Sequence, residues 1–467
     1  MKKTKIIATL GPSSDDPKIM EKLIDAGANV FRINFSHATQ EEKDHRIKSL
    51  REIEKRRKRP IAILQDLQGP KIRVGVIAEG IELKTGEEIV MTVSGVNKGE
   101  IPVQYKGIVG DVNVGDKILL ADGRFELKVL SKRHPKIKCK VITGGFLTSK
   151  KGINLPTSSI SLPALSAKDK EDVAYGLAND VDYIALSFVK SRKDILDLKK
   201  IIKKAGKDTK VIAKIERHEA VDNIDEIIEE ADAVMVARGD LGIEVSLADV
   251  PLLQKDIIKK CNARGKPVIV ATQMLDSMVR NPISTRAETS DIANAILDGA
   301  DAVMLSDETS VGKYPVNAVK AMRRIAMHAE GWSFATNKII GEDAVKKINS
   351  TSEAIGKSAA KLASELKAKV IINATARGKT TGNVARFRPH CPIISVTHTL
   401  KVARELELVW GVLPYVLDYK TVREMSRKST EIARSLNLVK EGDRAVMISG
   451  EEVGVEGGTN IIKVKEL

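Results

Sequence analysis

The chain has 467 residues, of which 42% are hydrophobic and 30% charged, and its formal net charge is +15 at pH 7. This length and composition predict a globular protein of roughly two to four domains. No apolar run approaches the ~20 residues that span a bilayer, and the N-terminal segment soon turns polar and acidic, so we expect neither a membrane span nor a signal peptide.

The charge distribution favours small anionic substrates. A net positive charge is compatible with nucleic acid, a membrane surface or small anions. Aromatic residues make up only 3% of the chain, which leaves few side chains to stack on bases. The densest basic run, "KRRKRP" at 55–60, is typical of a basic helix end. We therefore expect phosphorylated metabolites as partners, and neither nucleic acid nor a membrane.

The three cysteines indicate a reducing compartment. Cys139, Cys261 and Cys391 lie far apart and form no CxxC or CxxH spacing. Such cysteines are more often buried thiols than metal or redox groups. We therefore expect a cytoplasmic protein.

Short apolar strands alternate with amphipathic helices through most of residues 1–330. Near-continuous apolar strands joined by helices are typical of a parallel sheet, and eight such units predict a (β/α)8 TIM barrel. The predicted strands are IIATL (6–10), NVFRINF (29–35), IAILQDL (61–67), DYIALSF (182–188), VIAKIE (211–216), AVMVARGD (233–240), PVIVATQ (267–273) and AVMLSDE (302–308).

Two further domains are predicted around this barrel. Residues 70–159 alternate Val and Ile with polar residues and contain Asp-Gly turns, which predicts a small β-barrel domain inserted after the third strand as a lid. Residues 331–467 contain their own strands and helices, which predicts a C-terminal α/β domain. The catalytic barrel is assigned to residues 1–69 and 160–330. The C-terminal strands are predicted in "AKVIINATARG", "CPIISVTHTL", "RAVMISGEE" and "TNIIKVKEL", and the helices in "STSEAIGKSAAKLASEL" and "VREMSRKSTEIARSLNL".

Polar residues fall near the C-terminal ends of the predicted barrel strands. Residues i and i+2 of a strand face the same way, so each such pair projects together. In a (β/α)8 barrel these ends converge on the catalytic face. Six strands share the pattern, which favours one site over scattered loop polarity: Arg32-x-Asn34-x-Ser36, Asp66, Lys214-x-Glu216, Asp240, Thr272 and Ser306-x-Glu308.

The carboxylates among these residues predict a magnesium site. Glu216 and Asp240 offer two hard oxygen ligands, and Mg²⁺ takes one or two carboxylates while substrate oxygens complete its octahedron. The alternative is that these carboxylates only pair with Lys214 and Arg238.

The cations predict an anionic, phosphorylated substrate. Arg32, Arg73 and Lys214 bring three positive charges to the same face. The backbone N–H groups at Gly239 and Asp240 could hold a substrate carboxylate. Cations, Mg²⁺ and phosphate together indicate phosphoryl transfer or enolate chemistry.

Several long motifs resemble the pyruvate kinase family, in its single-chain bacterial or archaeal type. The resemblance covers nearly the whole chain in order, and it is weakest in the inserted domain and at 333–400. It rests on "KIIATLGPSS", "NVFRINFSHAT", "LQDLQGPKIR", "INLP", "KIERHEAVDNIDEII", "VMVARGDLGIEV", "VATQMLDSMVRNPISTRAETSDIANAILDGADAVMLSDETSVGKYPVNAV" and "GGTNIIKV".

The resemblance implies phosphoryl transfer from phosphoenolpyruvate to ADP in glycolysis, giving pyruvate and ATP. It implies that Glu216 and Asp240 hold Mg²⁺, with Mn²⁺ as an alternative ion. It implies that Lys214 lies over the phosphoryl group in flight and that Arg73 contacts the transferring phosphate. A lid residue, Asp122, matches an Asp that meets the metal of the nucleotide.

The remaining roles also come from matching positions. Thr272 lies beside the enolate carbon, and Ser306 with Glu308 assists the final protonation through water. Asp307 stands where many members have Gly, which leaves that protonation relay unsettled. The substrate and nucleotide contacts are assigned to Arg32, Asn34, His37, Lys71, Gly239, Asp240 and Thr272.

The stretch "QDLQGPKIRVG" departs from the members that require K⁺. Those members carry Thr, Lys and Glu where this chain has Leu67, Gln68 and Lys71, and their cation lies beside groups that match Asn34, Ser36 and Asp66. A fixed ammonium at residue 71 would repel K⁺ and supply the same field. The resemblance and this exchange predict a K⁺-independent enzyme with a vestigial monovalent-cation region at Asn34, Ser36, Asp66 and Leu67.

Regulation and assembly are less determined by the sequence. The resemblance implies a homotetramer. It also places a phosphorylated allosteric effector at a Gly/Thr loop, although this loop is equally well interpreted as an ordinary turn between a strand and a helix. The loop residues are Thr375, Arg377, Gly378, Lys379, Thr380 and Thr381. Two other functions stay open: a Mg²⁺-dependent aldolase or mutase that acts on pyruvate or phosphoenolpyruvate, and a non-enzymatic basic binding protein.

Overall fold

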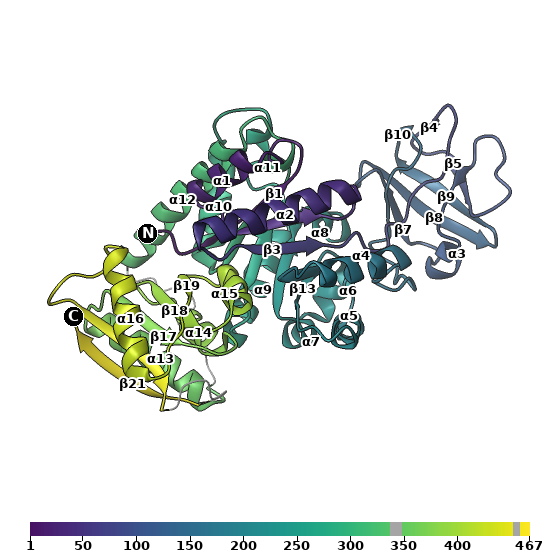
Figure 1. Cartoon of the computed structure of the whole chain (residues 1–467). Coiled ribbons are helices and arrows are strands. Elements are labelled where there is room, and N and C mark those ends of the chain that lie inside the picture. Colours follow the sequence, from purple (N-terminus) through teal and green to yellow (C-terminus); the bar gives the residue numbers. More distant parts are fainter. Residues whose placement is uncertain (337–347, 452–457) are drawn as a thin grey trace.

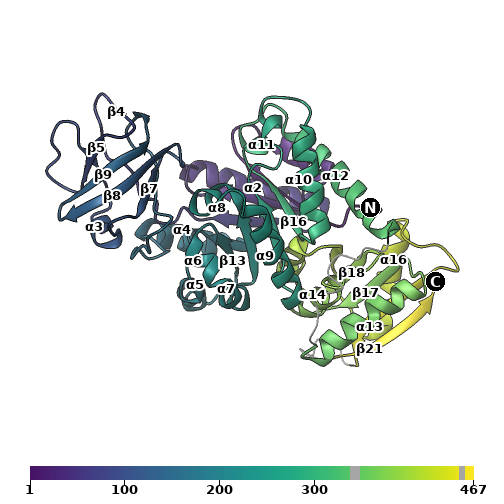
Figure 2. The same ribbon diagram turned by 180° about the vertical axis from the view of Figure 1, so that it is seen from behind.

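The computed structural model describes residues 1–336, 348–451 and 458–467. Three bodies lie in a row, with the barrel in the middle, the inserted lid at one end and the C-terminal domain at the other (Figures 1 and 2). Within the described residues, no helix has the length and apolar character needed to cross a bilayer.

The eight predicted barrel strands close into a parallel barrel, which confirms the predicted fold. β1 pairs with β2 on one side and with β16 on the other, and these two pairings close the ring. The order around the barrel is β1 (Lys5–Leu10), β16 (Ala302–Leu305), β15 (Val268–Ala271), β14 (Ala233–Ala237), β13 (Lys210–Ile215), β12 (Tyr183–Leu186), β3 (Ala62–Asp66) and β2 (Val30–Asn34).

Helices surround these strands, and local sequence signals set their ends. In α2 (Gln40–Arg57), the Thr39 hydroxyl accepts the Glu42 N–H and the Glu42 carboxylate accepts the Thr39 N–H, a capping box. The last turn of α2 is basic, as predicted from the run at 55–60. The other helices of the barrel domain are α1 (Pro17–Ala26), α4 (Ala167–Ala178), α5 (Arg192–Lys204), α6 (His218–Asp222), α7 (Ile224–Glu230), α8 (Arg238–Glu244), α9 (Val250–Arg264), η1 (Asp276–Val279), α10 (Arg286–Asp298), α11 (Asp307–Ser310) and α12 (Pro315–Ala335).

The lid is built mainly from strands, as predicted, but its ladders do not close into a ring within the described residues. A six-stranded sheet and a two-stranded ribbon form instead, and register shifts between β8 and β9 interrupt the ladder. The sheet has the order β11 (Ile153–Asn154), β7 (Lys117–Leu120), β8 (Phe125–Arg133), β9 (Lys136–Thr143), β5 (Glu88–Thr92) and β6 (Ile101–Pro102); the ribbon pairs β10 (Gly145–Leu147) with β4 (Ile81–Leu83), and α3 (Ile108–Asp111) is a single turn.

The C-terminal domain has a five-stranded sheet, including one strand that the sequence did not indicate. β19 contains Pro414, which weakens a strand signal and is tolerated because β19 lies at the sheet edge. Residue 452, the last of the third predicted strand "RAVMISGEE", lies outside the described residues. The order is β19 (Val412–Val416), β18 (Ile393–Thr397), β17 (Val370–Ala374), β20 (Arg444–Gly450) and β21 (Thr459–Glu466), with helices α13 (Thr351–Glu365), α14 (Lys379–Ala385), α15 (Leu400–Glu405), η2 (Leu406–Leu408) and α16 (Val422–Ser435).

The C-terminal domain closes the N-terminal end of the barrel. Leu408 is fully buried in the apolar cluster inside the barrel, with Ile7, Leu64 and Met235. The Tyr183 hydroxyl donates a hydrogen bond of 2.6 Å to the carbonyl of Glu405. The barrel helix α12 continues past residue 330, the predicted domain boundary, to Ala335. The opposite, C-terminal end of the barrel is therefore the end that faces the lid.

Candidate active site

Lys214 lies at the centre of the polar groups at the C-terminal ends of the barrel strands. Its ammonium is 2.8 Å from Glu216 Oε1 and 3.1 Å from Asp66 Oδ1, and it donates to Ser187 Oγ at 2.7 Å. Arg32 donates from Nε to Asp66 Oδ2 at 2.6 Å. Both oxygens of Asp66 therefore face a cation, and the structure brings together side chains from β2, β3 and the end of β13.

Burial and ion pairing oppose each other in this cluster. Burial disfavours the charge on Lys214, but Asp66 and Glu216 outweigh it and hold the Lys214 pKa above its usual value. Burial also disfavours the charge on Asp66, yet Lys214 and Arg32 lower its pKa. For Glu216 burial prevails, and with the charge of Asp240 it raises the pKa despite Lys214. Glu216 is therefore a carboxylate that a further cation would stabilise.

Gly239 and Asp240 lie in the first turn of α8, directly after β14. The Gly239 N–H donates to Thr272 Oγ1 at 2.7 Å, so in this structure it is engaged and not free for a substrate carboxylate. Thr272 has a φ of +70°, which is rare for a β-branched residue. Arg238 pairs with Asp291 at 2.7 Å. The Asp240 carboxylate forms no hydrogen bond or ion pair with any described residue.

Glu308 lies buried beside Ser306 at the end of β16. It is 2% exposed, and its carboxylate accepts the N–H of Leu275 at 2.9 Å and that of Ser306 at 2.7 Å. Burial raises the pKa of Glu308, and the neighbouring charge of Asp307 adds to this. The acidic residue at 307 is thus electrostatically coupled to Glu308.

A cavity of about 380 Å³ lies between the lid and this face of the barrel. Arg73, Lys71, Asp122 and Asp240 line it, and Arg73 Nη1 donates to the Lys150 carbonyl at 3.0 Å. The volume lies within the range of small-molecule sites, roughly 300–1,000 Å³. Cations outnumber carboxylates in its lining, so the cavity suits an anionic ligand.

Lys190 and Arg217 also line this cavity, and sequence reasoning missed them. Each follows the C-terminal end of a barrel strand, so the rule that found the other residues would have found these too. Lys190 Nζ donates to the carbonyls of Ile160 and Leu162, both at 2.7 Å, and ties the segment that returns from the lid to the barrel.

Asn34 and His37, at and after the end of β2, and Leu67, directly after β3, lie at the same face but do not line the cavity. Asn34 Oδ1 accepts the Ser36 N–H at 3.0 Å, and His37 is exposed. Leu67 is 1% exposed, and its carbonyl accepts the Ser187 hydroxyl at 2.8 Å.

Lys71 lies on the cavity wall rather than inside the cluster around Asp66. Its side chain is exposed, and no hydrogen bond or ion pair joins it to another part of the described chain. It is one of the cations that a ligand in the lid cavity would meet.

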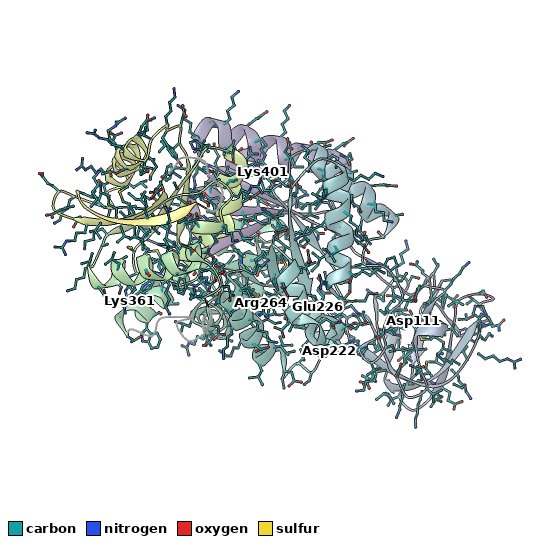
Figure 3. All side chains as sticks on the ribbon, turned by 90° about the horizontal axis from the view of Figure 1, so that it is seen from below. Asp111, Asp222, Glu226, Arg264, Lys361 and Lys401 are labelled. Atoms are coloured by element: carbon teal, nitrogen blue, oxygen red, sulfur yellow. The ribbon has the colours of Figure 1, made fainter. Side chains whose placement is uncertain are left out.

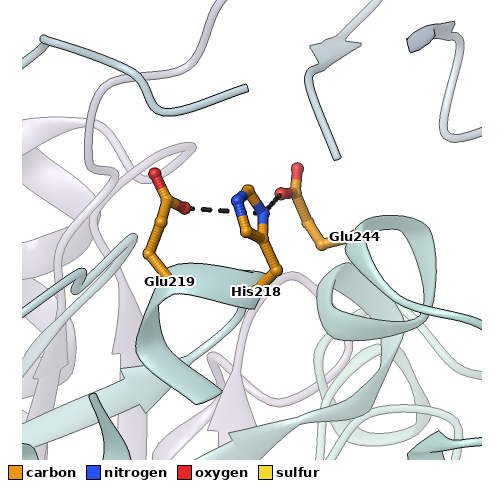
Figure 4. Close-up of side chains that lie close together, drawn as sticks. All are labelled: His218, Glu219 and Glu244. Atoms are coloured by element: carbon orange, nitrogen blue, oxygen red, sulfur yellow. Dashed lines mark hydrogen bonds and ion pairs between the residues drawn. The ribbon is translucent and has the colours of Figure 1, made fainter. Parts of the chain in front are cut away.

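A second group of potential metal ligands lies just outside the predicted site (Figure 4). His218, Glu219 and Glu244 hold their ligand atoms within 4.8 Å of one another. The Arg217 guanidinium already lies 2.6 Å from Glu219 and 3.6 Å from Glu244, and Asn154 donates to Glu244 at 3.1 Å. This group therefore forms an ion-pair network that ties Asn154, at the base of the lid, to α8.

The threonines of the predicted effector loop are engaged within the C-terminal domain. Arg377, Gly378 and Lys379 instead line a second cavity, between that domain and the barrel. The hydroxyl partners are the Gly378 N–H for Thr375, Thr459 for Thr380, and Ser395 with Asn373 for Thr381.

Taken together, the closed (β/α)8 barrel, the charged residues at its C-terminal end and the lid above them define a lid-covered TIM-barrel enzyme. Residues 1–319 match the family model "Pyruvate kinase, barrel domain", and residues 353–465 match "Pyruvate kinase, alpha/beta domain". The chain belongs to the pyruvate kinase family.

Individual relatives agree with this assignment. A pyruvate kinase of Staphylococcus epidermidis is 43% identical over 470 residues, and one of Staphylococcus aureus is 44% identical; each alignment covers 99% of this chain and 80% of the relative. A crystal structure of a pyruvate kinase from Cryptosporidium parvum has a TM-score of 0.94 and 36% identity, and covers 100% of this chain and 96% of that one. These matches favour a pyruvate kinase over an aldolase, a mutase or a basic binding protein. The substrates are thus phosphoenolpyruvate and ADP, and the products pyruvate and ATP.

Proposed function

We propose that this enzyme works with Mg²⁺ and without K⁺, at the face where β13 and β14 end. The observation that carries the proposal is Lys214, held between Asp66 and Glu216 beside a cation-lined cavity. Phosphoryl transfer needs positioning and positive charge more than covalent chemistry from the protein. A buried ammonium fixed by two carboxylates supplies that charge without reorganisation.

Glu216 and Asp240 are the proposed ligands of the divalent ion, which Mn²⁺ could replace. Two observations support them. The pKa of Glu216 is raised by burial and by Asp240, and the Asp240 carboxylate has no hydrogen-bond or ion-pair partner among the described residues. Two carboxylates suit Mg²⁺, which fills its other positions with water and substrate oxygens. When bound, the ion neutralises charge on the phosphoryl group and the enolate.

The roles of the other residues follow the course of the reaction. Lys214 stabilises the phosphoryl group between the enol oxygen and the terminal oxygen of ADP, and Arg73 holds that group from the lid side. Arg32 and His37 face the nucleotide, and Asp122 approaches it as the lid closes.

The enolate is then protonated at carbon. Thr272 lies on the proposed enolate side, with its hydroxyl fixed by the Gly239 N–H. Ser306 and Glu308 position the proton-donating water, and the buried Glu308 has the raised pKa that suits an acid.

Independence from K⁺ is proposed from Lys71 and Leu67. Leu67 offers only a carbonyl, which the Ser187 hydroxyl already occupies, and both oxygens of Asp66 already face cations. The Lys71 ammonium replaces a carboxylate of the K⁺-dependent members, so it supplies a fixed charge near the substrate. We further propose a cytoplasmic, glycolytic homotetramer that responds to a phosphorylated effector bound at the C-terminal domain.

Titration with Mg²⁺ tests the metal ligands. Glu216→Gln and Asp240→Asn should each raise the Mg²⁺ concentration for half-maximal activity at least tenfold, because each removes an anionic ligand. Asp197→Asn, which alters an exposed carboxylate paired with Lys200 on α5, is the control. A wild-type titration for either ligand variant would remove that residue from the site.

A further inference from the structure

The lid returns to the barrel through residues 155–166, called here the return segment, which runs from the end of β11 to the capping residue of α4. Directly before it, the chain is bonded to the outgoing connection of the lid. The Ile153 N–H donates to the Ile72 carbonyl at 2.9 Å, and Arg73 pairs with Gly152. Arg73 therefore has to follow any movement of the chain that leads into the return segment.

On one side, the return segment is bonded to the lid. The Ser158 hydroxyl donates to Asp116 Oδ2 at 2.6 Å, and the Ser161 N–H donates to Asp111 Oδ2 at 3.1 Å. The hydroxyls of Ser161 and Tyr105 lie 2.7 Å apart. Asp111, labelled in Figure 3, lies in the lid, as Asp116 and Tyr105 do. Hydroxyl and N–H groups thus join the return segment to the lid.

On the other side, carbonyls of the return segment are bonded to two cations of the barrel. Lys190 Nζ donates to the carbonyls of Ile160 and Leu162, both at 2.7 Å. Arg217 Nη2 donates to the Ser158 carbonyl at 3.4 Å. The two bonds of Lys190 are the shorter ones, so Lys190 is the main barrel contact among these cations.

The backbone of Lys190 is a fixed base for this contact. Its N–H donates to Asp194 Oδ2, in the first turn of α5, at 2.9 Å, and its carbonyl accepts the side-chain amide of Asn223 at 2.9 Å. Two residues earlier, the Phe188 N–H donates to Glu216 Oε2 at 2.8 Å. The side chain of Lys190 therefore reaches the return segment from a part of the barrel that is bonded to the active-site cluster.

Lys190 also lines the cavity between the lid and the barrel. An ammonium has three N–H donors, and two of these bond the carbonyls of Ile160 and Leu162. A carbonyl does not neutralise the ammonium, and no described carboxylate forms an ion pair with the Lys190 side chain. One N–H donor and the full positive charge are left for an anion in the cavity.

We propose that Lys190 is a positioning residue that couples the anionic substrate in the cavity to the return segment of the lid. Two of its N–H groups hold the segment against the barrel, and the third donates to the substrate. Hydrogen bonds from an ammonium are roughly twice as strong as neutral ones. A bound anion therefore restrains the ammonium, and through it the lid and Arg73. The effect on catalysis through Arg73 rests on the proposed function, whereas the hold on the return segment does not.

Hydrogen–deuterium exchange of the full-length enzyme, measured by mass spectrometry, tests this hold. Lys190→Met should exchange the amides of residues 157–165 at least fivefold faster, because opening of the segment no longer breaks the two ammonium bonds. Lys190→Arg should exchange them near the wild-type rate, since a guanidinium can also donate to two carbonyls. Lys193→Met is the matched control, because Lys193 is an exposed lysine of α5 whose side chain has no described hydrogen-bond or ion-pair partner.

Phosphoenolpyruvate with Mg²⁺, added without ADP so that no turnover occurs, tests the coupling. Each enzyme receives a concentration well above its own KM. The substrate should slow exchange of the return segment at least threefold in the wild type and in Lys190→Arg, and should leave it unchanged in Lys190→Met. In steady-state assays, Lys190→Met should raise the KM for phosphoenolpyruvate at least tenfold and lower kcat less, and Lys190→Arg should restore most of the KM.

Two results would overturn the proposal. If Lys190→Met exchanges the return segment at the wild-type rate, Lys190 does not hold it. If exchange is faster but the substrate protects the segment as in the wild type, Lys190 has only a structural role. Failure of the proposed function has another signature, a wild-type Mg²⁺ titration in Glu216→Gln or Asp240→Asn. If Lys190→Met is unfolded at the assay temperature, Lys190→Gln, which keeps a polar group without the charge, gives the same two tests.

Discussion

Replacing Lys214 with Met separates transition-state stabilisation from substrate binding. Lys214 is 12% exposed and contacts Asp66, Glu216 and Ser187 between 2.7 and 3.1 Å. Its charge is needed most while the phosphoryl group is between oxygens. Removal of one preorganised charged donor from a buried site lowers kcat by about 10²–10³, equivalent to about 3–4 kcal/mol. The KM for phosphoenolpyruvate should change less than tenfold.

The same substitution has a stability cost that must be measured alongside. Met leaves Glu216 without a cation, while Asp66 keeps Arg32. Breaking a buried pair in this way costs about 3–5 kcal/mol, and the retained Arg32 places the expected loss near the lower end. Thermal unfolding will show whether the variant is folded at the assay temperature.

The assay is steady-state pyruvate formation with phosphoenolpyruvate and ADP varied in turn. Lys190→Met is the matched control, because Lys190 is also a lysine after a barrel strand but is bonded to backbone carbonyls. It should raise KM more than it lowers kcat. If Lys214→Met keeps more than a tenth of the wild-type kcat, or if kcat and KM change by equal factors, Lys214 only anchors the ground state.

Three further predictions address the cation, the proton relay and the domain interface. In tetramethylammonium buffer at constant ionic strength, added KCl should activate the enzyme less than tenfold, whereas Lys71→Glu with Leu67→Thr should create a K⁺ requirement; strong activation of the wild type would refute this. Asp307→Gly should move the Glu308-dependent inflection of kcat to lower pH, because Asp307 contributes to raising the pKa of Glu308; an unmoved inflection would exclude the coupling. Burial raises the pKa of Glu405 from 4.5 to about 7. Between these two pH values the carboxyl group keeps its proton in the folded chain but has lost it in the unfolded chain, so the stability of the fold falls as pH rises from 4.5 to 7. Glu405→Gln should therefore stabilise the protein above pH 7, by up to about 3 kcal/mol, and little at pH 4.5; an equal change in melting temperature at both pH values would contradict the raised pKa.

The barrel could be predicted because its strands are buried on both faces. Such strands are apolar along their whole length, as β12, β14 and β16 are, and this makes them visible without any alternation. β19 could not be found in the same way. It lies at the edge of the sheet, where one side of the strand has no neighbour to hydrogen-bond. Pro414 is therefore tolerated in the structure, although it weakens the strand pattern in the sequence.

The candidate site could be predicted only in part. The ends of the strands indicate which residues lie at the catalytic face, but they do not indicate which groups those residues bind. The i, i+2 pattern placed Lys214 and Glu216 on one face, and the structure has them 2.8 Å apart. It could not show that the Gly239 N–H is used by Thr272, since that bond depends on a left-handed backbone at residue 272. Long-range partners of this kind are set by packing between strands rather than by local sequence.

The two buried arginines of the C-terminal domain carry this distinction furthest. In the segment "ARFRP" they are two residues apart, and no sequence rule separates them. Packing gives Arg388 hydrogen bonds to a carboxylate, an amide oxygen and a carbonyl, whereas Nε and Nη2 of Arg386 form no hydrogen bond and its ion pair with Glu353 spans 3.7 Å. The packing between the barrel and the C-terminal domain, and not the local sequence, therefore decides which of two neighbouring arginines is fully hydrogen-bonded.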